Sequence, residues 1–120
     1  MQKTGSKIIV RLPIEGTHQW KGCGIEEVKF LANEHRHIFY IEAKKRVSHL
    51  DRDIEIIQFK RSIIDYLLER YYDNATHYCH FGNMSCEMIA QELIEQFGLC
   101  SCAVMEDNEN GAEIEILDSM

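Results

Sequence analysis

The sequence predicts an α+β fold, in which a small four-stranded antiparallel sheet carries two helices on one face. Three observations lead to this class. Apolar residues alternate with period two near both ends of the chain, they recur at helical spacing in the middle, and polar or glycine-containing segments separate these stretches. The resulting order is strand, strand, helix, helix, strand, strand. Helices grouped between two hairpins are typical of an antiparallel sheet that is covered on one side.

The first half of the chain predicts the first hairpin. Residues 7–14, KIIVRLPI, form a strand that ends near the only proline, and residues 15–24 contain three glycines and predict a loop. Residues 25–33 are compatible with a short helix or with irregular structure. Residues 35–47 alternate between apolar and charged side chains, which predicts the second strand.

The period then changes from two to that of a helix. The segment IEII at 54–57 predicts a strand or strand end, and apolar residues recur at helical spacing over 58–72. Residues 73–84 are polar and predict a linker. For a second helix over 86–97, Ser85 is a suitable N-cap and Gly98 a natural stop.

The last hairpin follows directly. Residues 99–106 alternate as a strand, the segment DNENG predicts a tight connection, and residues 112–117 alternate again. The complete pattern fits one domain over residues 1–120, since a chain of this length buries roughly two-thirds of its unfolded surface.

Composition narrows the classes of partner. The net charge is −7 and the pI is near 5.3, and the only basic cluster is residues 44–46, so we expect no nucleic acid partner. No apolar run approaches the roughly 20 residues that span a bilayer, so we expect no membrane partner. The chain starts without the apolar core of a signal peptide and has five cysteines, an odd number. These features favour reduced thiols and a cytoplasmic location.

Histidines stand at two places in the first hairpin. His35 and His37 are one residue apart at the head of the second strand, so both imidazoles lie on the same face of an extended segment. His18 follows the first strand. Three imidazole nitrogens are a typical catalytic zinc ligand set, which leaves one position for water or substrate. The alternative is that His35 and His37 cap an exposed strand edge and that His18 is unrelated to them.

Five short motifs follow one another along residues 7–116. The first is His18 after the first strand, and the second is HRH at residues 35–37, which is similar to His-Gly-His. The third is IEIIQFK, which is similar to Val-Asp-Phe-x-x-Leu-Lys at Ile54, Glu55, Ile56, Phe59 and Lys60. The last two are Ser85-Cys86-Glu87, which is similar to Thr-Ser-Glu, and Glu106 at the end of the penultimate strand. In this order they resemble the 6-pyruvoyltetrahydropterin synthase and 6-carboxytetrahydropterin synthase family.

That resemblance implies the tunnelling fold, with ββααββ topology and subunits that assemble into an oligomeric barrel. We therefore expect a trimer or, preferably, a hexamer. It also implies a zinc ion held by the three histidines, and a pterin-like or purine-like ring anchored by the Glu106 carboxylate, with Ser85 and Glu87 beside it. A carboxylate can accept two parallel hydrogen bonds from such a ring edge. The alternative for Glu106 is an ordinary solvated residue in an acidic turn.

The catalytic positions match the family less closely. The family's reactive cysteine stands a few residues before His-x-His, whereas Cys23 lies twelve residues before His35, and Arg36 replaces the central glycine. Cys23 is our candidate base or nucleophile. His77 and His80 are the candidates for the family's proton relay. His77, Cys79, His80 and Cys86 fit no standard zinc spacing, so a polar loop is the preferred interpretation of that segment.

Two functions remain open at this stage. The first is a zinc-dependent lyase, similar to 6-pyruvoyl/6-carboxytetrahydropterin synthase, that acts on a substrate of the dihydroneopterin triphosphate type. The second is a non-catalytic protein of the same fold that sequesters a purine-, nucleotide- or pterin-like ligand. The displaced cysteine favours the binding protein, and the histidine triad favours the enzyme.

Overall fold

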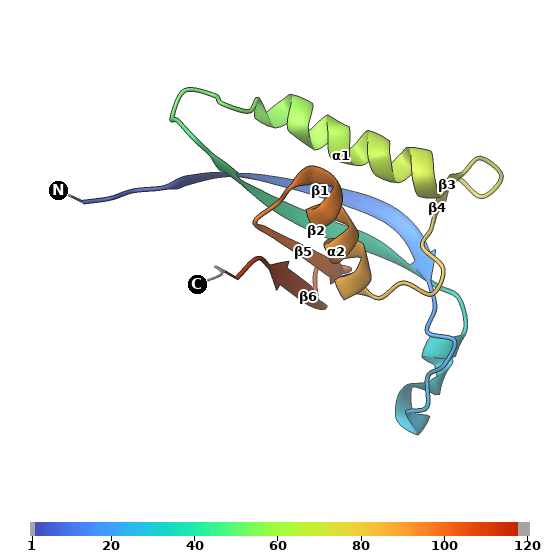
Figure 1. Ribbon diagram of the computed structural model, residues 1–120. Coiled ribbons are helices and arrows are strands. Elements are labelled where there is room, and N and C mark those ends of the chain that lie inside the picture. The colour runs from blue at the N-terminus through green and yellow to red at the C-terminus, as the bar shows by residue number, and fades with distance from the viewer. Residues whose placement is uncertain (1, 118–120) are drawn as a thin grey trace.

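The computed structural model describes residues 2–117 and shows a six-stranded sheet with three helices (Figure 1). The strands are β1 (Ser6–His18), β2 (His35–Val47), β3 (Tyr72–Asp73), β4 (Tyr78–His80), β5 (Ser101–Glu106) and β6 (Asn110–Glu115). The helices are the 3-10 helix η1 (Glu26–Ala32) and the α-helices α1 (Ile56–Tyr71) and α2 (Cys86–Phe97). The strand order is β3-β4-β1-β2-β5-β6.

The predicted four-stranded antiparallel sheet with two helices is therefore wrong. The sheet is mixed, because β4 runs parallel to β1 while all other neighbours are antiparallel. β4 has three residues and lies, like most of the β3–β4 hairpin, in the segment that we expected to be a linker. A strand of two or three residues is too short to show an alternating pattern, so the sequence gives no periodic signal for it. The ββααββ topology is corrected accordingly, and the structure does not show the expected oligomeric barrel.

β1 is longer than the sequence predicted. It pairs with β2 along its whole length, from Ser6 opposite Val47 to His18 opposite His35. The segment Glu15–His18, expected to be a loop, is thus held in the sheet by the partner strand. Gly16 permits this, because a Cβ atom there would lie 2.8 Å from the Phe81 ring.

The segment at 54–57 is a helix start and not a strand. Ile56 is the first residue of α1, and the Glu55 side chain caps the helix by accepting hydrogen bonds from the backbone N–H groups of Ile57 and Gln58, each at 3.0 Å. These bonds satisfy two of the four N–H groups that a helix start leaves without an intrahelical partner. At α2 the expected Ser85 N-cap and Gly98 C-cap are confirmed, the latter with φ of 62°.

One face of the sheet carries the hydrophobic core. Both α-helices cover this face: α1 packs on β1, and α2 packs on β5 and β6 (Figure 1). The largest fully buried side chains are Phe39, Leu12, Ile41, Ile63, Leu67, Ile89, Leu93, Val104, Cys79 and Cys102. These residues alternate along the strands and recur at helical spacing in the helices. One hydrophobic cluster can therefore include residues of β1, β2, β4, β5, α1 and α2.

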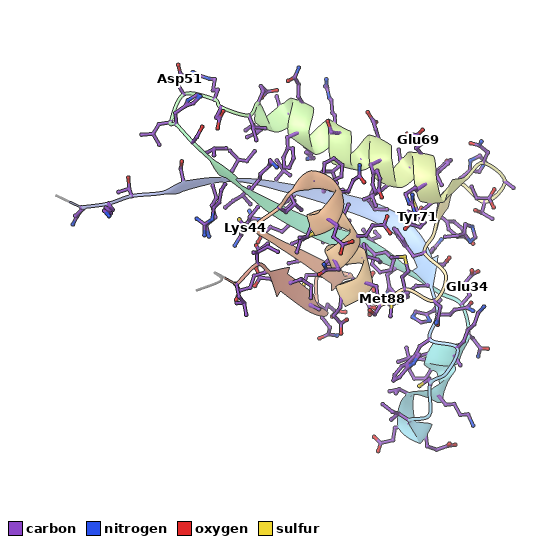
Figure 2. The ribbon with its side chains drawn as sticks, viewed as in Figure 1. Glu34, Lys44, Asp51, Glu69, Tyr71 and Met88 are labelled. Atoms are coloured by element: carbon purple, nitrogen blue, oxygen red, sulfur yellow. The ribbon has the colours of Figure 1, made fainter. Side chains whose placement is uncertain are left out.

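The connection from β1 to β2 projects from the end of the sheet as a finger, defined here as residues 19–34 (Figure 1). Its helix η1 has no buried residues, and Ile25 and Phe30 are exposed. Figure 2 shows Glu34, at the base of the finger, and Met88, in the first turn of α2, at the same end of the molecule, while Asp51 lies at the opposite end. None of the helices within residues 2–117 has the length and apolar character needed to cross a membrane.

Candidate metal centre

Three histidines meet at the end of the β1–β2 hairpin from which the finger projects. His18 and His35 are directly opposite in the register, and His37 lies two residues further along β2, opposite Gly16. Since strand residues two apart share a face, all three imidazoles lie on the face that carries the core. One ring nitrogen from each histidine can be chosen so that all three lie within 4.8 Å of one another. The cluster could therefore hold a metal ion.

Each imidazole is oriented by a partner at its Nδ1 atom. His18 Nδ1 lies 2.9 Å from the Met84 carbonyl oxygen, and His35 Nδ1 lies 2.8 Å from the Asn33 carbonyl oxygen. A carbonyl oxygen can only accept a hydrogen bond, so both Nδ1 atoms must carry the proton and donate it. In the neutral imidazole this leaves the lone pair on Nε2, the tautomer that a metal requires at that atom.

His37 is oriented by a carboxylate. Its Nδ1 atom donates to Asp107 Oδ2 at 2.7 Å, and Asp107 Oδ1 accepts from the Ile38 backbone N–H at 3.0 Å. Both hydrogen bonds favour the ionised carboxyl group, the bond from His37 most, and they lower the pKa of Asp107. A carboxylate behind a histidine ligand fixes its tautomer and raises its basicity, which is a common arrangement at protein metal sites.

The Nε2 atoms of His18 and His37 are buried, and neither has a hydrogen-bond partner in the part of the chain that the structure describes. Buried polar atoms of this kind are rare, because leaving them unsatisfied costs about 1–3 kcal/mol. His18 is only 8% exposed, and its burial lowers the pKa of its imidazole, an effect that the Met84 bond and the nearby Glu106 only partly offset. A neutral imidazole with a buried, unpaired lone pair fits a bound cation.

Glu106 faces these two nitrogen atoms from the end of β5. Its Oε2 atom lies 3.0 Å from His18 Nε2, and its Oε1 atom lies 3.5 Å from His37 Nε2. The position follows from the sheet register, which places Glu106 opposite Phe39, two residues beyond His37. The carboxylate thus adds negative charge beside the three imidazoles.

A pocket of about 530 Å³ opens beside the cluster. It lies between the base of the finger, the start of α2 and the β5–β6 hairpin. Its lining residues are His18, Gln19, Trp20, Leu31, His35, Asn83, Met84, Ser85, Cys86, Glu87, Met88, Glu106, Asn110 and Gly111. This volume lies within the usual range for small-molecule sites.

The predicted ligand-binding residues all line this pocket. Glu106 lies on its wall, Ser85 is the N-cap of α2, and Glu87 belongs to the first turn of that helix. The predicted catalytic residues do not line it. Cys23 is buried inside the finger, where its thiol lies 3.6 Å from the Val28 carbonyl oxygen.

His77 and His80 lie in the β3–β4 hairpin. His77 is exposed in the turn with φ of 67°. His80 contacts Thr76 Oγ1 at 2.8 Å through Nε2, and its Nδ1 atom lies 3.5 Å from Glu34 at the base of the finger. These contacts join the hairpin to the finger. They do not bring His77 or His80 into the lining of the pocket.

Asp107 and Cys86 also belong to the site, although no sequence motif points to them as site residues. Asp107 follows Glu106 directly in the sequence. Only the pairing of β2 with β5 shows that its carboxylate lies beside His37. Cys86 lies in the pocket wall with its Sγ atom 3.6 Å from Glu106 Oε2. Burial, reinforced by the Glu106 carboxylate, raises the pKa of Cys86 to about 12, so the thiol is protonated and donates to that oxygen.

Compared with known proteins, the chain matches no family model and no curated protein.

Proposed function

We propose that this protein holds a zinc ion and binds a pterin-like or purine-like ring next to it, and that it acts as a lyase similar to 6-pyruvoyl/6-carboxytetrahydropterin synthase. Its substrate would be of the dihydroneopterin triphosphate type. The observation that carries the proposal is the convergence of three oriented imidazoles, with two buried and unpaired Nε2 atoms, beside a pocket large enough for a fused ring.

The choice of zinc rests on the donor set. Three imidazole nitrogens beside a carboxylate suit zinc better than magnesium or calcium, which prefer oxygen ligands. His18, His35 and His37 would hold the ion, with Nδ1 of each fixed by Met84, Asn33 or Asp107. When bound, zinc would supply a Lewis acid that polarises an oxygen of the substrate.

The ring would lie in the pocket against Glu106 and the start of α2. A carboxylate presents two acceptors to the paired N–H donors of a pterin or guanine edge, which orients the ring as well as binding it. Trp20, at the base of the finger, contributes apolar surface to the same pocket. Apolar walls with a few well-placed polar groups are typical of such sites.

The second candidate is a non-catalytic protein that sequesters a purine-, nucleotide- or pterin-like ligand. The observation in its favour is that Cys23, His77 and His80 are outside the lining of the pocket. In the lyase, Cys23 moves protons with help from His77 or His80. The Cys23 thiol would then have to leave its contacts with the backbone carbonyls of the finger, between Gly22 and Gly24.

We further propose that the protein associates with itself as a trimer or hexamer. β6 is an edge strand, and β4 covers the outer edge of β1 only at Gly16 and Thr17. Exposed strand edges are suited to pairing with another chain. A cytoplasmic location remains our expectation, and the free cysteines, four of them buried, are compatible with it.

An activity assay separates the two functions. Zinc-loaded protein is incubated with dihydroneopterin triphosphate, and products are followed by chromatography alongside a binding titration with neopterin. The lyase predicts turnover that Cys23→Ser abolishes while neopterin binding persists. It also predicts that Glu106→Gln weakens binding, because an amide offers one acceptor where the ring edge needs two.

Binding of neopterin without conversion, unchanged by Cys23→Ser, would favour the sequestering protein. Failure to bind either compound would contradict the lyase and the sequestering of a pterin-like ligand. Glu109→Gln is the matched control for Glu106→Gln, since it removes one charge from the same hairpin at an exposed residue outside the pocket lining.

A further inference from the structure

We propose that Glu106 is itself a ligand of the metal, so that the ligand-free protein has a closed site of three histidines and one glutamate. The inference rests on the metal site of the proposed function but assigns Glu106 a role that the proposed function does not include. It follows from the positions of the carboxylate oxygens, from the hydrogen bonding of the imidazoles, and from the contacts that hold the carboxylate in place.

Two of the distances from Glu106 match those of atoms that share one ion. The group of ligand atoms that all lie within 4.8 Å of one another contains the three histidines and not Glu106, so the carboxylate would have to move closer to His35 to complete the site. With metal–ligand bonds of about 2.0–2.2 Å, the ligand atoms of a tetrahedral zinc site are roughly 3.3 Å apart. The two Glu106 oxygens lie 3.0 Å from His18 Nε2 and 3.5 Å from His37 Nε2. Glu106 therefore stands at ligand-to-ligand distance from two of the three imidazoles.

When the imidazoles are neutral, only acceptors face the centre. Because Nδ1 of His18 and of His35 donates to a backbone carbonyl, the neutral rings present lone pairs at Nε2. The Glu106 carboxylate presents lone pairs as well, and the pair formed with His18 Nε2 lacks hydrogen-bond geometry. Several acceptors that face one another at this short range repel each other unless a proton or a metal cation lies between them.

The carboxylate is held in this position from two sides. The β2–β5 pairing places Glu106 opposite Phe39, and the Cys86 Sγ atom lies 3.6 Å from Oε2. The next residue, Asp107, accepts from His37 Nδ1. Consecutive carboxylates thus lie on the two nitrogen sides of one imidazole: Asp107 orients the ring, and Glu106 faces its Nε2 atom.

One consequence concerns the ring-bearing ligand. The oxygens that would accept hydrogen bonds from a pterin-like ring are the same oxygens that face the imidazoles. A ring that binds Glu106 would therefore draw the carboxylate away from the metal and open one coordination position. Ring binding and access to the metal would be coupled through this side chain.

Cobalt binding to the full chain tests the inference without any assay of activity. Metal-free protein is titrated with Co²⁺, whose visible absorption is intense in four-coordinate tetrahedral sites and weak when water raises the coordination number. Zinc affinity is then measured by competition with a chelator. Glu113→Gln is the matched control, because it removes one charge from a β6 residue outside the pocket lining.

We expect the wild type and Glu113→Gln to show the intense spectrum without a thiolate-to-cobalt band, which excludes Cys86 as the fourth ligand. Glu106→Gln should show a changed spectrum, because water or the amide then takes the fourth position, and should bind zinc roughly tenfold or more weakly, at least as large an effect as the loss of a residue that only orients a ligand. Equal spectra and affinities for the wild type and Glu106→Gln would overturn the inference and leave the three-histidine site intact.

Other outcomes remain decisive. If the wild type binds neither Co²⁺ nor Zn²⁺, the metal site of the proposed function fails and this inference with it. If Glu106→Gln does not fold by circular dichroism, X-ray absorption of zinc-loaded wild type decides. Three imidazoles with a coordinated carboxylate support the inference, and three imidazoles with water overturn it.

Discussion

At the scale of single residues, the properties of the metal centre are set by what each imidazole contacts on the side away from the pocket. Two of the three Nδ1 atoms donate to backbone carbonyls, which no substitution of a side chain can remove. The third donates to the Asp107 carboxylate, which is the only charged group among these three partners. Substitution of Asp107 therefore tests whether a charged partner raises the basicity of the His37 imidazole.

We predict that Asp107→Asn lowers zinc affinity about 10- to 100-fold while leaving the fold intact. The amide oxygen of asparagine can still accept the hydrogen bond from His37 but lacks the charge that makes this imidazole a better ligand. Affinity is measured by chelator competition, and the fold by circular dichroism. Glu109→Gln, in the same turn, should bind zinc as the wild type does. An unchanged affinity for Asp107→Asn would show that His37 does not ligate the metal in this orientation.

At the scale of elements, the site is built where several of them end. β1 ends at His18, β2 starts at His35, β5 ends at Glu106 and α2 starts at Cys86. Residues at the ends of strands and helices are held by the regular structure behind them and still face the pocket. The start of α1 is another element end with a defined side-chain role, because the Glu55 side chain accepts hydrogen bonds from two backbone N–H groups there.

We predict that Glu55→Gln destabilises the protein at neutral pH and that this effect disappears in acid. Hydrogen bonds from the backbone N–H groups of Ile57 and Gln58 lower the pKa of Glu55 in the folded state. The unfolded state therefore binds the proton more readily, so the stabilisation is fully present above the ordinary carboxyl pKa and is lost as the pH falls through the folded value.

Urea unfolding of both proteins at pH 7 and in acid measures this effect. The difference in midpoint between the wild type and Glu55→Gln should be clear at pH 7 and should shrink as Glu55 of the wild type becomes protonated. A difference that is equal at both pH values would show that the carboxylate charge does not contribute to the cap. Glu69→Gln, near the end of the same helix, controls for the general loss of a negative charge.

At the scale of the whole molecule, the sheet is extended and open. The principal extents of the molecule are 55 × 35 × 22 Å, and within residues 2–117 no strand pairs with the outer edge of β6 or with most of the outer edge of β1. On the sheet face opposite the helices, Ile9, Ile38 and Tyr40 are exposed. Open edges and exposed apolar side chains both favour association of chains.

We predict that light scattering after gel filtration at micromolar concentration gives the mass of a trimer or a hexamer. Pairing of strand edges buries backbone groups that water would otherwise have to solvate, and the exposed apolar residues add hydrophobic burial. Replacing Glu113, an exposed residue near the middle of edge strand β6 whose N–H faces away from β5, by proline should reduce the mass, because proline cannot donate to a strand ladder. A monodisperse wild-type monomer would contradict the prediction.

Part of the candidate site could be read from the sequence because its signals are local. The spacing of His35 and His37 already places both imidazoles on one face of a strand, and Ser85 and Gly98 mark the ends of α2 through capping chemistry that acts within a few residues. The structure confirms these features and brings His18 to the same place. Local rules sufficed at these positions but not at the start of α1, where the Glu55 cap also acts within one turn and residues 54–57 were still predicted to be a strand or strand end.

The tertiary structure decided what depends on pairing between distant segments. β1 reaches His18 because β2 pairs with it along its whole length, and β3 and β4 add two strands that are too short to show a period. The β2–β5 register brings Glu106 and Asp107 to opposite nitrogens of His37, although some 70 residues separate them along the chain. The free energy of strand pairing depends on which two segments lie side by side in the folded sheet. The sequence by itself therefore determined the shared face of His35 and His37, and only the folded sheet brought His18 and the surrounding carboxylates to them.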